Sequence, residues 1–234
     1  MLKFSDFDSR GYQTVDVRSG YEEWAATYER TVEDEMDIAL LDALVTPDWS
    51  GVRTAADLGC GTGRTGAWLK SRGVPDVDGV DLAPEMLRLA AGKHVYRRLE
   101  ESNVATTPLN ANAYDLVVAC LIDEHLPDVT PLYREAARLA ASSALLVVVG
   151  FHPYFIMAAG MPTHYNSGSG EPLAIETHVH LMSDHVTAGV ANGWPLREMK
   201  ERLIDDRWVA LKPKWESFRH RPISFAMVWG RPSP

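Results

Sequence analysis

The chain has 234 residues, a length that suits one large α/β domain better than two small ones. Hydrophobic residues make up 46% of it and charged residues 24%, which are ordinary values for a globular protein. The formal net charge of −9 disfavours binding to nucleic acid, because proteins that bind the phosphate backbone need a basic face to displace counterions.

Cysteine content and hydropathy indicate where such a domain works. Two cysteines, Cys60 and Cys120, in a chain of this length predict reduced thiols and not a disulfide scaffold. The N-terminal MLKFSDFDSR has no apolar core of signal-peptide length, and no run reaches the ~18 apolar residues of a membrane span. We therefore expect a cytoplasmic protein without a membrane partner, either a monomer or a homodimer.

The first fifty residues are predicted to be helical. Tyr21, Trp24 and Tyr28 recur at i, i+3 and i+7, which indicates an aromatic face on a short helix. Apolar residues from Met36 to Leu44 repeat with helical spacing and predict a second helix, which Pro47 ends.

From residue 52 the pattern changes to short apolar runs that alternate with helical segments. Strands are expected at 54–58, 77–81, 95–99, 116–121, 144–149 and 223–229, with helices near 65–71, 84–90 and 131–141. Strands that are apolar on both faces, such as ALLVVV, indicate a mostly parallel sheet covered by helices on each side. The expected fold is a Rossmann-like, doubly wound α/β domain, with its core at 51–150.

Residues 151–190 interrupt this alternation after the fifth expected strand. They contain Pro153, Pro162 and Pro172, the loop NSGSGEP and a group of histidines. An insertion after the carboxyl end of a strand lies where doubly wound sheets bind ligands, so we expect it to form a substrate pocket. Residues 191–234 complete the domain. The stretch WPLREMKERLI within them fits either a helix or an edge strand.

The turn in TAADLGCGTGRTGAWL carries two overlapping glycine fingerprints. Gly61, Gly63 and Gly66 fit the dinucleotide pattern, whereas Asp57 with Gly59 and the glycines that follow fits another nucleoside-binding loop. A strand, a glycine-rich turn and a helix place backbone N–H groups around a ligand. A lone glycine pattern is weak evidence, however, because glycines also serve tight turns.

Two acidic residues help to identify the ligand. Asp81 ends the next strand, 22 residues after Gly59, where an acid accepts hydrogen bonds from both ribose hydroxyls of NAD or S-adenosylmethionine. Asp57 would repel a pyrophosphate but attract the ammonium group of S-adenosylmethionine. The aromatic face of the N-terminal helix also suits a cation. The turn therefore favours S-adenosylmethionine as the cofactor and S-adenosylhomocysteine as the product.

At this point the chain resembles the class I S-adenosylmethionine-dependent methyltransferases, particularly their small-molecule group, through DLGCGTGR and GVDLAPEML. The resemblance implies a seven-stranded sheet with one antiparallel strand, and an N-terminal lid (residues 1–50) formed around YEEWAATYER. It also implies the following cofactor contacts: Gly59, Gly61, Gly63 and Cys120 for the methionine part, Asp81 for the ribose, Leu82, Met86 and Asn103 for adenine, and Tyr28 for the carboxylate. We add Asp57 and Tyr21 to this set. Arg64 either contacts the cofactor or caps helix carbonyls.

The acceptor side requires alignment of a nucleophile, exclusion of water and, for some acceptors, one general base. Histidine candidates are His125 and several residues of the insertion, from which we select His152 and His180, with Tyr165, as the catalytic group. His178 and His180 also form a His-x-His pair. No acidic or cysteine partner stands at a convincing spacing, so no metal is expected.

The leading hypothesis is an enzyme of specialised metabolism that methylates an oxygen or nitrogen atom of a small molecule. A second hypothesis keeps the cofactor but cyclises its aminobutyl chain and releases methylthioadenosine. A third is a non-catalytic cofactor-binding protein, and a dehydrogenase comes fourth.

Overall fold

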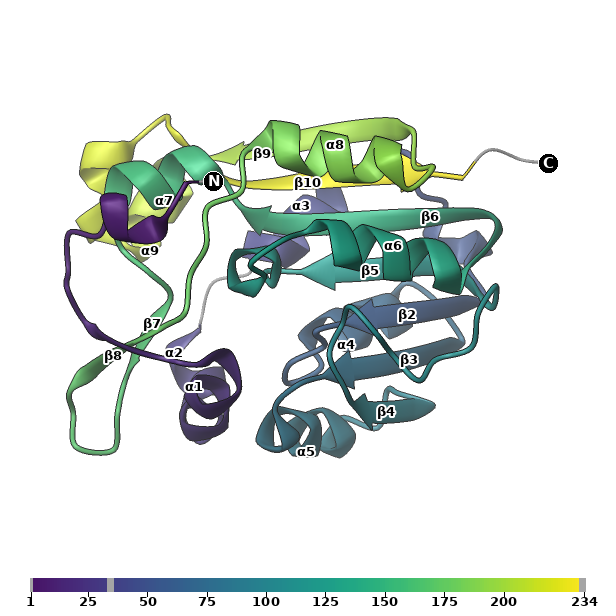
Figure 1. Cartoon of the computed structure of the whole chain (residues 1–234), viewed down its shortest axis with the longest axis horizontal. Helices are drawn as coiled ribbons and strands as arrows, with labels where there is room; N and C mark the ends of the chain where they lie inside the picture. The colour runs from purple at the N-terminus through teal and green to yellow at the C-terminus, as the bar shows by residue number, and fades with distance from the viewer. Residues whose placement is uncertain (1, 33–35, 232–234) are drawn as a thin grey trace.

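A computed structural model describes residues 2–32 and 36–231 of the chain. Its main feature is a seven-stranded sheet with the strand order β4-β3-β2-β5-β6-β10-β9 (Figure 1). The strands are β2 (Thr54–Leu58), β3 (Asp76–Asp81), β4 (Arg98–Glu101), β5 (Tyr114–Cys120), β6 (Ala140–Phe151), β9 (Leu196–Leu203) and β10 (Pro222–Gly230).

The strand directions match those that the family resemblance implies. β10 runs antiparallel to both of its neighbours, β6 and β9, whereas the other paired strands of this sheet run parallel. The ambiguous stretch contains β9, so its interpretation as an edge strand is correct and the helical one is wrong. Side chains 198–203 alternate between half-buried and exposed, as expected for a strand that is covered on one face.

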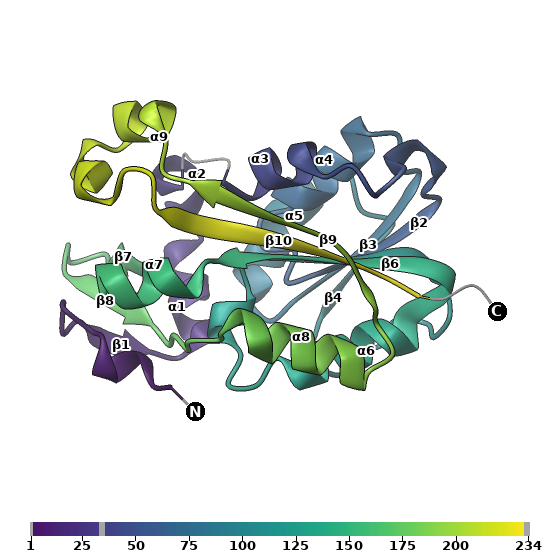
Figure 2. The same ribbon diagram turned by 90° about the horizontal axis from the view of Figure 1, so that it is seen from above.

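Helices cover both faces of the sheet, which confirms the doubly wound prediction. Figure 2 shows α3 and α4 on one side and α6 and α8 on the other. The apolar run in β6 has a direct cause: Val147 and Val149 pack into one core, and Leu146 and Val148 into the core on the opposite face. The main helices on the two faces, among the described residues, are α3 (Met36–Ala43), α4 (Arg64–Ser71), α5 (Pro84–Gly92), α6 (Thr130–Leu139) and α8 (Met182–Ala191).

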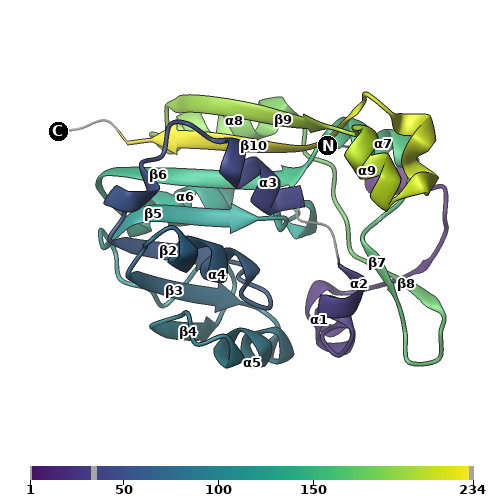
Figure 3. The same ribbon diagram turned by 180° about the vertical axis from the view of Figure 1, so that it is seen from behind.

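A second, small sheet joins the N-terminal region to the insertion. It contains β1 (Gln13–Val15), β8 (Pro172–Ile175) and β7 (His164–Asn166), with β1 parallel to β8. With α1 (Val17–Trp24) and α2 (Tyr28–Thr31), this sheet stands off the carboxyl ends of the central strands (Figure 3). The aromatic stripe thus spans two short helices and not one. The N-terminal region also contributes a strand, which corrects the expectation of a purely helical lid.

The remaining elements of the described ranges are short helices. They are α7 (Pro153–Ala159), α9 (Asp206–Leu211) and the 3-10 helices η1 (Phe4–Asp6), η2 (Trp49–Gly51), η3 (Asp123–His125) and η4 (Pro213–Phe218). Across the described ranges, none of the helices combines the length and the apolar character that crossing a bilayer requires.

Candidate active site

A first cavity lies at the carboxyl ends of β2, β3 and β5. The expected cofactor residues among those that line it are Tyr21, Tyr28, Gly59, Gly61, Arg64, Asp81, Leu82, Met86, Asn103 and Cys120. Parallel strands end at a common edge of the sheet, so the turns that follow β2 and β3 meet there. The cavity therefore forms where the glycine fingerprint predicts a nucleoside site.

The turn after β2 adopts the backbone that its glycines predict. Gly59, Gly61 and Gly63 have φ values of 72°, 51° and 87°, in the left-handed region that disfavours other residues. A Cβ atom on Gly61 would enter open space, whereas one on Gly63 would crowd Ala90 and Tyr96. Gly61 therefore leaves room for a ligand. Gly63 is the N-cap of α4, outside the residues described as lining either cavity, and its need for glycine comes from its φ value and from packing.

Asp81 ties the two turns together. One of its carboxylate oxygens accepts a hydrogen bond from the Gly61 N–H at 2.7 Å, and the other accepts from the Ala83 N–H at 2.9 Å. Burial raises the pKa of this carboxyl group, and the backbone N–H donors oppose that rise. Each oxygen keeps a further lone pair, so the carboxylate fits two neighbouring ribose hydroxyls.

Asp57 supports the turn from outside the lining of either cavity. Its Oδ2 atom accepts a hydrogen bond from the Tyr96 hydroxyl at 2.7 Å, and its side chain is buried. Burial raises the pKa of this carboxyl group to about 7. The expected position beside the cofactor ammonium is therefore corrected to a position among Tyr96 and the start of α4.

Asp37 is the acidic residue of this cavity that sequence reasoning missed. Its Oδ2 atom pairs with the Arg64 guanidinium, with distances of 3.1 Å to Nε and 3.0 Å to Nη2. Its Oδ1 atom is buried without a hydrogen-bond partner among the described residues. The signal was present in the sequence, because this aspartate stands between Met36 and Leu40, among the apolar residues of the predicted helix. Arg64 therefore lies at the cavity, the first of its two expected positions.

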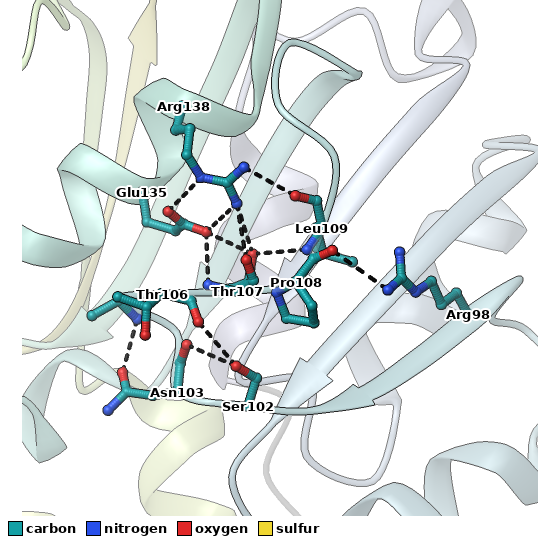
Figure 4. Close-up of polar contacts among 10 residues, drawn as sticks. Arg98, Ser102, Asn103, Thr106, Thr107, Pro108, Leu109, Glu135 and Arg138 are labelled. Carbon is teal, nitrogen blue, oxygen red and sulfur yellow. Dashed lines mark hydrogen bonds and ion pairs between the residues drawn. The ribbon is translucent and has the colours of Figure 1, made fainter.

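Asn103 lines the cavity from the loop that follows β4, but its side chain is engaged within that loop. The Oδ1 atom accepts a hydrogen bond from the Ala105 N–H at 2.8 Å. Figure 4 shows how α6 holds the same loop through Glu135 and Arg138, which bond to Thr107 and the residues around it. One lone pair of the amide oxygen remains for adenine, so the predicted contact stays a prediction.

A second cavity of about 570 Å³ adjoins the first. Tyr21, Tyr28 and Leu121 line both. The lid, the insertion, α9 and η4 build its walls, which are rich in aromatic rings: Trp24, Phe151, Phe155, Tyr165, Trp208 and Trp215. A cavity of this size and character suits a small organic molecule.

Two of the three expected catalytic residues lie outside the described lining of both cavities. His152 caps α7, where its Nδ1 atom accepts from the Tyr154 N–H and its Nε2–H donates to Glu201. His180 is buried, and its Nε2–H donates to the Leu126 carbonyl at 2.7 Å. Both rings thus hydrogen-bond groups of the protein, because the irregular insertion and the segments packed against it have polar groups that need partners. Their expected position at the transferred group is thereby corrected.

Tyr165 does line the second cavity. Its ring stacks on that of Trp24, with centroids 5.7 Å apart, and its hydroxyl donates to Glu23 at 2.9 Å. Tyr165 thus fastens the insertion to α1 while it contributes an aromatic face to the cavity. A catalytic role for its hydroxyl stays a prediction.

The junction of the cavities carries a polar network from η3. The His125 Nδ1–H donates to the Glu176 carbonyl at 2.7 Å, so in the neutral ring Nε2 accepts the Tyr21 hydroxyl at 2.8 Å. Burial lowers the pKa of His125 to about 4, which keeps the ring neutral at pH 7. His125 lines the cofactor cavity and Glu124 the second cavity. The DEH sequence after a buried strand was the available signal for Glu124, which sequence reasoning passed over.

Comparisons with known proteins agree with this geometry. Residues 56–148 match a family described as a methyltransferase domain. Ajmaline N-methyltransferase from Rauvolfia serpentina is 29% identical over 103 residues, which cover 42% of this chain and 35% of that protein. The chain thus spans about a third of the length of this curated relative.

Two solved structures share the fold over most of the chain. An S-adenosylmethionine-dependent methyltransferase from Mesorhizobium loti has a TM-score of 0.65 at 22% identity, covering 83% of this chain and 96% of that one. Geranyl diphosphate C-methyltransferase from Streptomyces coelicolor, in complex with S-adenosyl-L-homocysteine, has a TM-score of 0.62 at 16% identity, covering 97% and 93%. Residues 56–148 thus match a methyltransferase domain, and the two solved structures share the fold of the chain.

Proposed function

We propose that this chain transfers the methyl group of S-adenosylmethionine to an oxygen or nitrogen atom of a small molecule. The observation that carries the proposal is the junction of the two cavities, where Tyr21, Tyr28 and Leu121 contribute to both linings. A nucleophile held in the second cavity is thereby brought close to a cofactor held in the first. Such positioning supplies most of what a methyl displacement needs from a protein.

The residues of the first cavity fit this cofactor. Bound S-adenosylmethionine supplies an electrophilic methyl group on a sulfonium. Asp81 holds the ribose, and Leu82 and Met86 flank the adenine. Asp37 takes the ammonium group through its unpaired oxygen, and Arg64 binds the carboxylate.

Calorimetry and product analysis test the proposal together. S-adenosylhomocysteine is expected to bind, and NAD is not, because the Asp37 carboxylate disfavours a pyrophosphate in this cavity. Incubation with labelled S-adenosylmethionine and a metabolite pool is then expected to label a small molecule and release S-adenosylhomocysteine. Binding of NAD with comparable strength would favour a dehydrogenase instead.

Incubation with the cofactor alone distinguishes the remaining alternatives. Release of methylthioadenosine without an acceptor would support cyclisation of the aminobutyl chain. Binding of S-adenosylhomocysteine without turnover of any acceptor would support a non-catalytic protein. The second cavity argues against both, because neither needs a separate cavity of about 570 Å³.

We expect the lid and the insertion to gain protection together when S-adenosylhomocysteine binds. β1 pairs with β8 and Trp24 stacks on Tyr165, so the two segments form one unit over the cofactor cavity. Amide hydrogen exchange with and without the ligand measures this effect. Slower exchange in 13–24 and 164–175 is the expected result. Equal exchange in both states would mean that the unit is fixed and does not act as a lid.

A further inference from the structure

We propose that the acceptor is a small apolar amine and that Glu124 binds and deprotonates its nitrogen. This inference rests on the proposed methyl transfer and names its substrate class. Glu124 follows the carboxyl end of β5 and lines the second cavity, and its Oε1 atom lies 3.4 Å from Nε2 of His125, which lines the first. It is therefore an acidic group near the junction at which an acceptor meets the methyl group.

Among the described residues, no cationic side chain forms an ion pair with the Glu124 carboxylate. The residue is 3% exposed, and Thr163 donates its hydroxyl to Oε1 at 2.7 Å. The Nε2 atom of His125 lies 3.4 Å from the same oxygen, but that neutral ring uses its N–H on the Glu176 carbonyl. A buried carboxylate without a cationic partner is costly, and a bound ammonium would supply that partner.

The walls of the cavity suit the same ligand. Tyr21, Trp24, Tyr28 and Tyr165 form a contiguous group of rings, with centroid distances of 4.9 to 6.2 Å between neighbours. Aromatic faces attract cations, and the apolar edges accept a hydrophobic ring system. Amine, aromatic wall and carboxylate therefore complement one another in charge and in polarity.

The environment also adjusts Glu124 for proton transfer. Burial raises the pKa of its carboxyl group to about 8, close to the value that a general base needs near neutral pH. The positive charge of a bound ammonium favours the ionised form of the Glu124 carboxyl group. The carboxylate then takes one proton from the ammonium and becomes a neutral acid, which frees the nitrogen lone pair. The amine then forms the new N–C bond as the C–S bond of the sulfonium breaks, and the electron pair stays on sulfur. The positive charge ends on the methylated nitrogen.

Two lysines of the same cavity suggest the competing ligand, an anionic acceptor. Lys212 and Lys214 come from the α9–η4 wall, and their ammonium groups lie over the rings of Trp208 and Trp215 at 5.4 and 5.3 Å. They are thus already placed on indole faces. Glu124 by contrast lies against His125, which lines the cofactor cavity, so an anion at the junction would meet its carboxylate. The geometry favours the amine, and a carboxylate probe tests the other ligand.

The experiment uses four bicyclic probes of similar size with the full chain and S-adenosylhomocysteine or labelled S-adenosylmethionine. Tetrahydroisoquinoline is the secondary amine, isochroman replaces its N–H by an ether oxygen, and naphthol and naphthoate offer a hydroxyl and a carboxylate. Calorimetry in the presence of S-adenosylhomocysteine is expected to show at least tenfold tighter binding of tetrahydroisoquinoline than of isochroman. Tetrahydroisoquinoline is also expected to be the probe that gains the labelled methyl group.

Glu124→Gln tests the residue, and Glu171→Gln at an exposed loop position is the matched control. Glutamine keeps an acceptor for the Thr163 hydroxyl but takes no proton. We expect kcat/KM for the amine to fall by about 100-fold or more and its affinity to fall about tenfold, with S-adenosylhomocysteine affinity unchanged. The control variant is expected to match the unaltered chain in all three measurements.

Each other result has a definite meaning. Three results would overturn the amine inference and leave methyl transfer standing. They are equal binding of amine and isochroman, normal amine turnover by Glu124→Gln, and methylation of naphthol or naphthoate in preference to the amine. Binding of S-adenosylhomocysteine without binding of the amine would overturn it as well. Failure of the unaltered chain to bind S-adenosylhomocysteine would instead overturn the proposed function.

Discussion

Asp81→Ala is expected to weaken S-adenosylhomocysteine binding by about 2–4 kcal/mol, which corresponds to a loss of roughly 30-fold to 1,000-fold in affinity. Two charge-assisted hydrogen bonds to the ribose are lost with the carboxylate. The substitution also leaves the Gly61 and Ala83 N–H groups without their acceptor, so the turn that cradles the ligand loosens. Calorimetric titration of both proteins measures the difference.

Asp76→Ala provides the matched control for this prediction. Asp76 stands at the opposite end of β3, where it pairs with the Arg97 guanidinium at 3.2 Å, away from the cavity lining. We expect its removal to leave S-adenosylhomocysteine affinity within about twofold, because an exposed ion pair contributes little. Wild-type affinity in the Asp81→Ala variant would mean that the ribose binds elsewhere.

The free energy of unfolding of the unaltered chain is expected to fall as the pH rises. Glu124→Gln is expected to make this fall smaller. The folded-state pKa of Glu124 is raised to about 8 from an ordinary value of 4.5 by burial, with the neighbouring Asp123 charge acting in the same direction. Between these two values the folded chain holds a proton that the unfolded chain has released. The free energy of unfolding therefore falls as the pH rises from 4.5 to about 8, and levels off above that.

The magnitude follows from the size of the shift. At about 1.4 kcal/mol per pKa unit, this one group costs the unaltered chain roughly 2–3 kcal/mol between pH 6 and pH 9. Glutamine has no proton to lose, so denaturant unfolding should show a smaller pH dependence in Glu124→Gln. Asp57, whose pKa is also raised, acts in both proteins and cancels in the comparison. Parallel pH profiles of the two proteins would contradict a buried, protonated Glu124.

This second prediction separates stability from function at one position. A neutral side chain at 124 is expected to stabilise the chain at high pH and to abolish proton removal from an amine. Stability and turnover should thus move in opposite directions, which a merely structural residue would not produce.

Local patterns in the sequence determined the fold and the cofactor end of the site. The glycine turn of 59–63 and Asp81 lie within one strand–turn–helix–strand unit, where residue spacing decides which atoms meet. The apolar residues of α3 repeat with helical spacing because one stripe of that helix is buried. The run 144–149 of β6 is apolar throughout because both faces of that strand are covered. Boundaries were less certain: β4 begins at Arg98 and not at residue 95.

Only the tertiary structure decided which side chains line the second cavity. Tyr21, His125 and Glu176 meet in one network although more than fifty residues separate each neighbouring pair along the chain. A histidine in an insertion has many ways to satisfy its ring nitrogens, and the sequence does not distinguish a backbone carbonyl from a ligand as its partner. In the structure His180 donates a hydrogen bond to the Leu126 carbonyl, whereas Glu124 lines the second cavity. The positions of these side chains depend on how the lid and the insertion pack on the sheet. The spacing of apolar residues along the chain does not determine that packing.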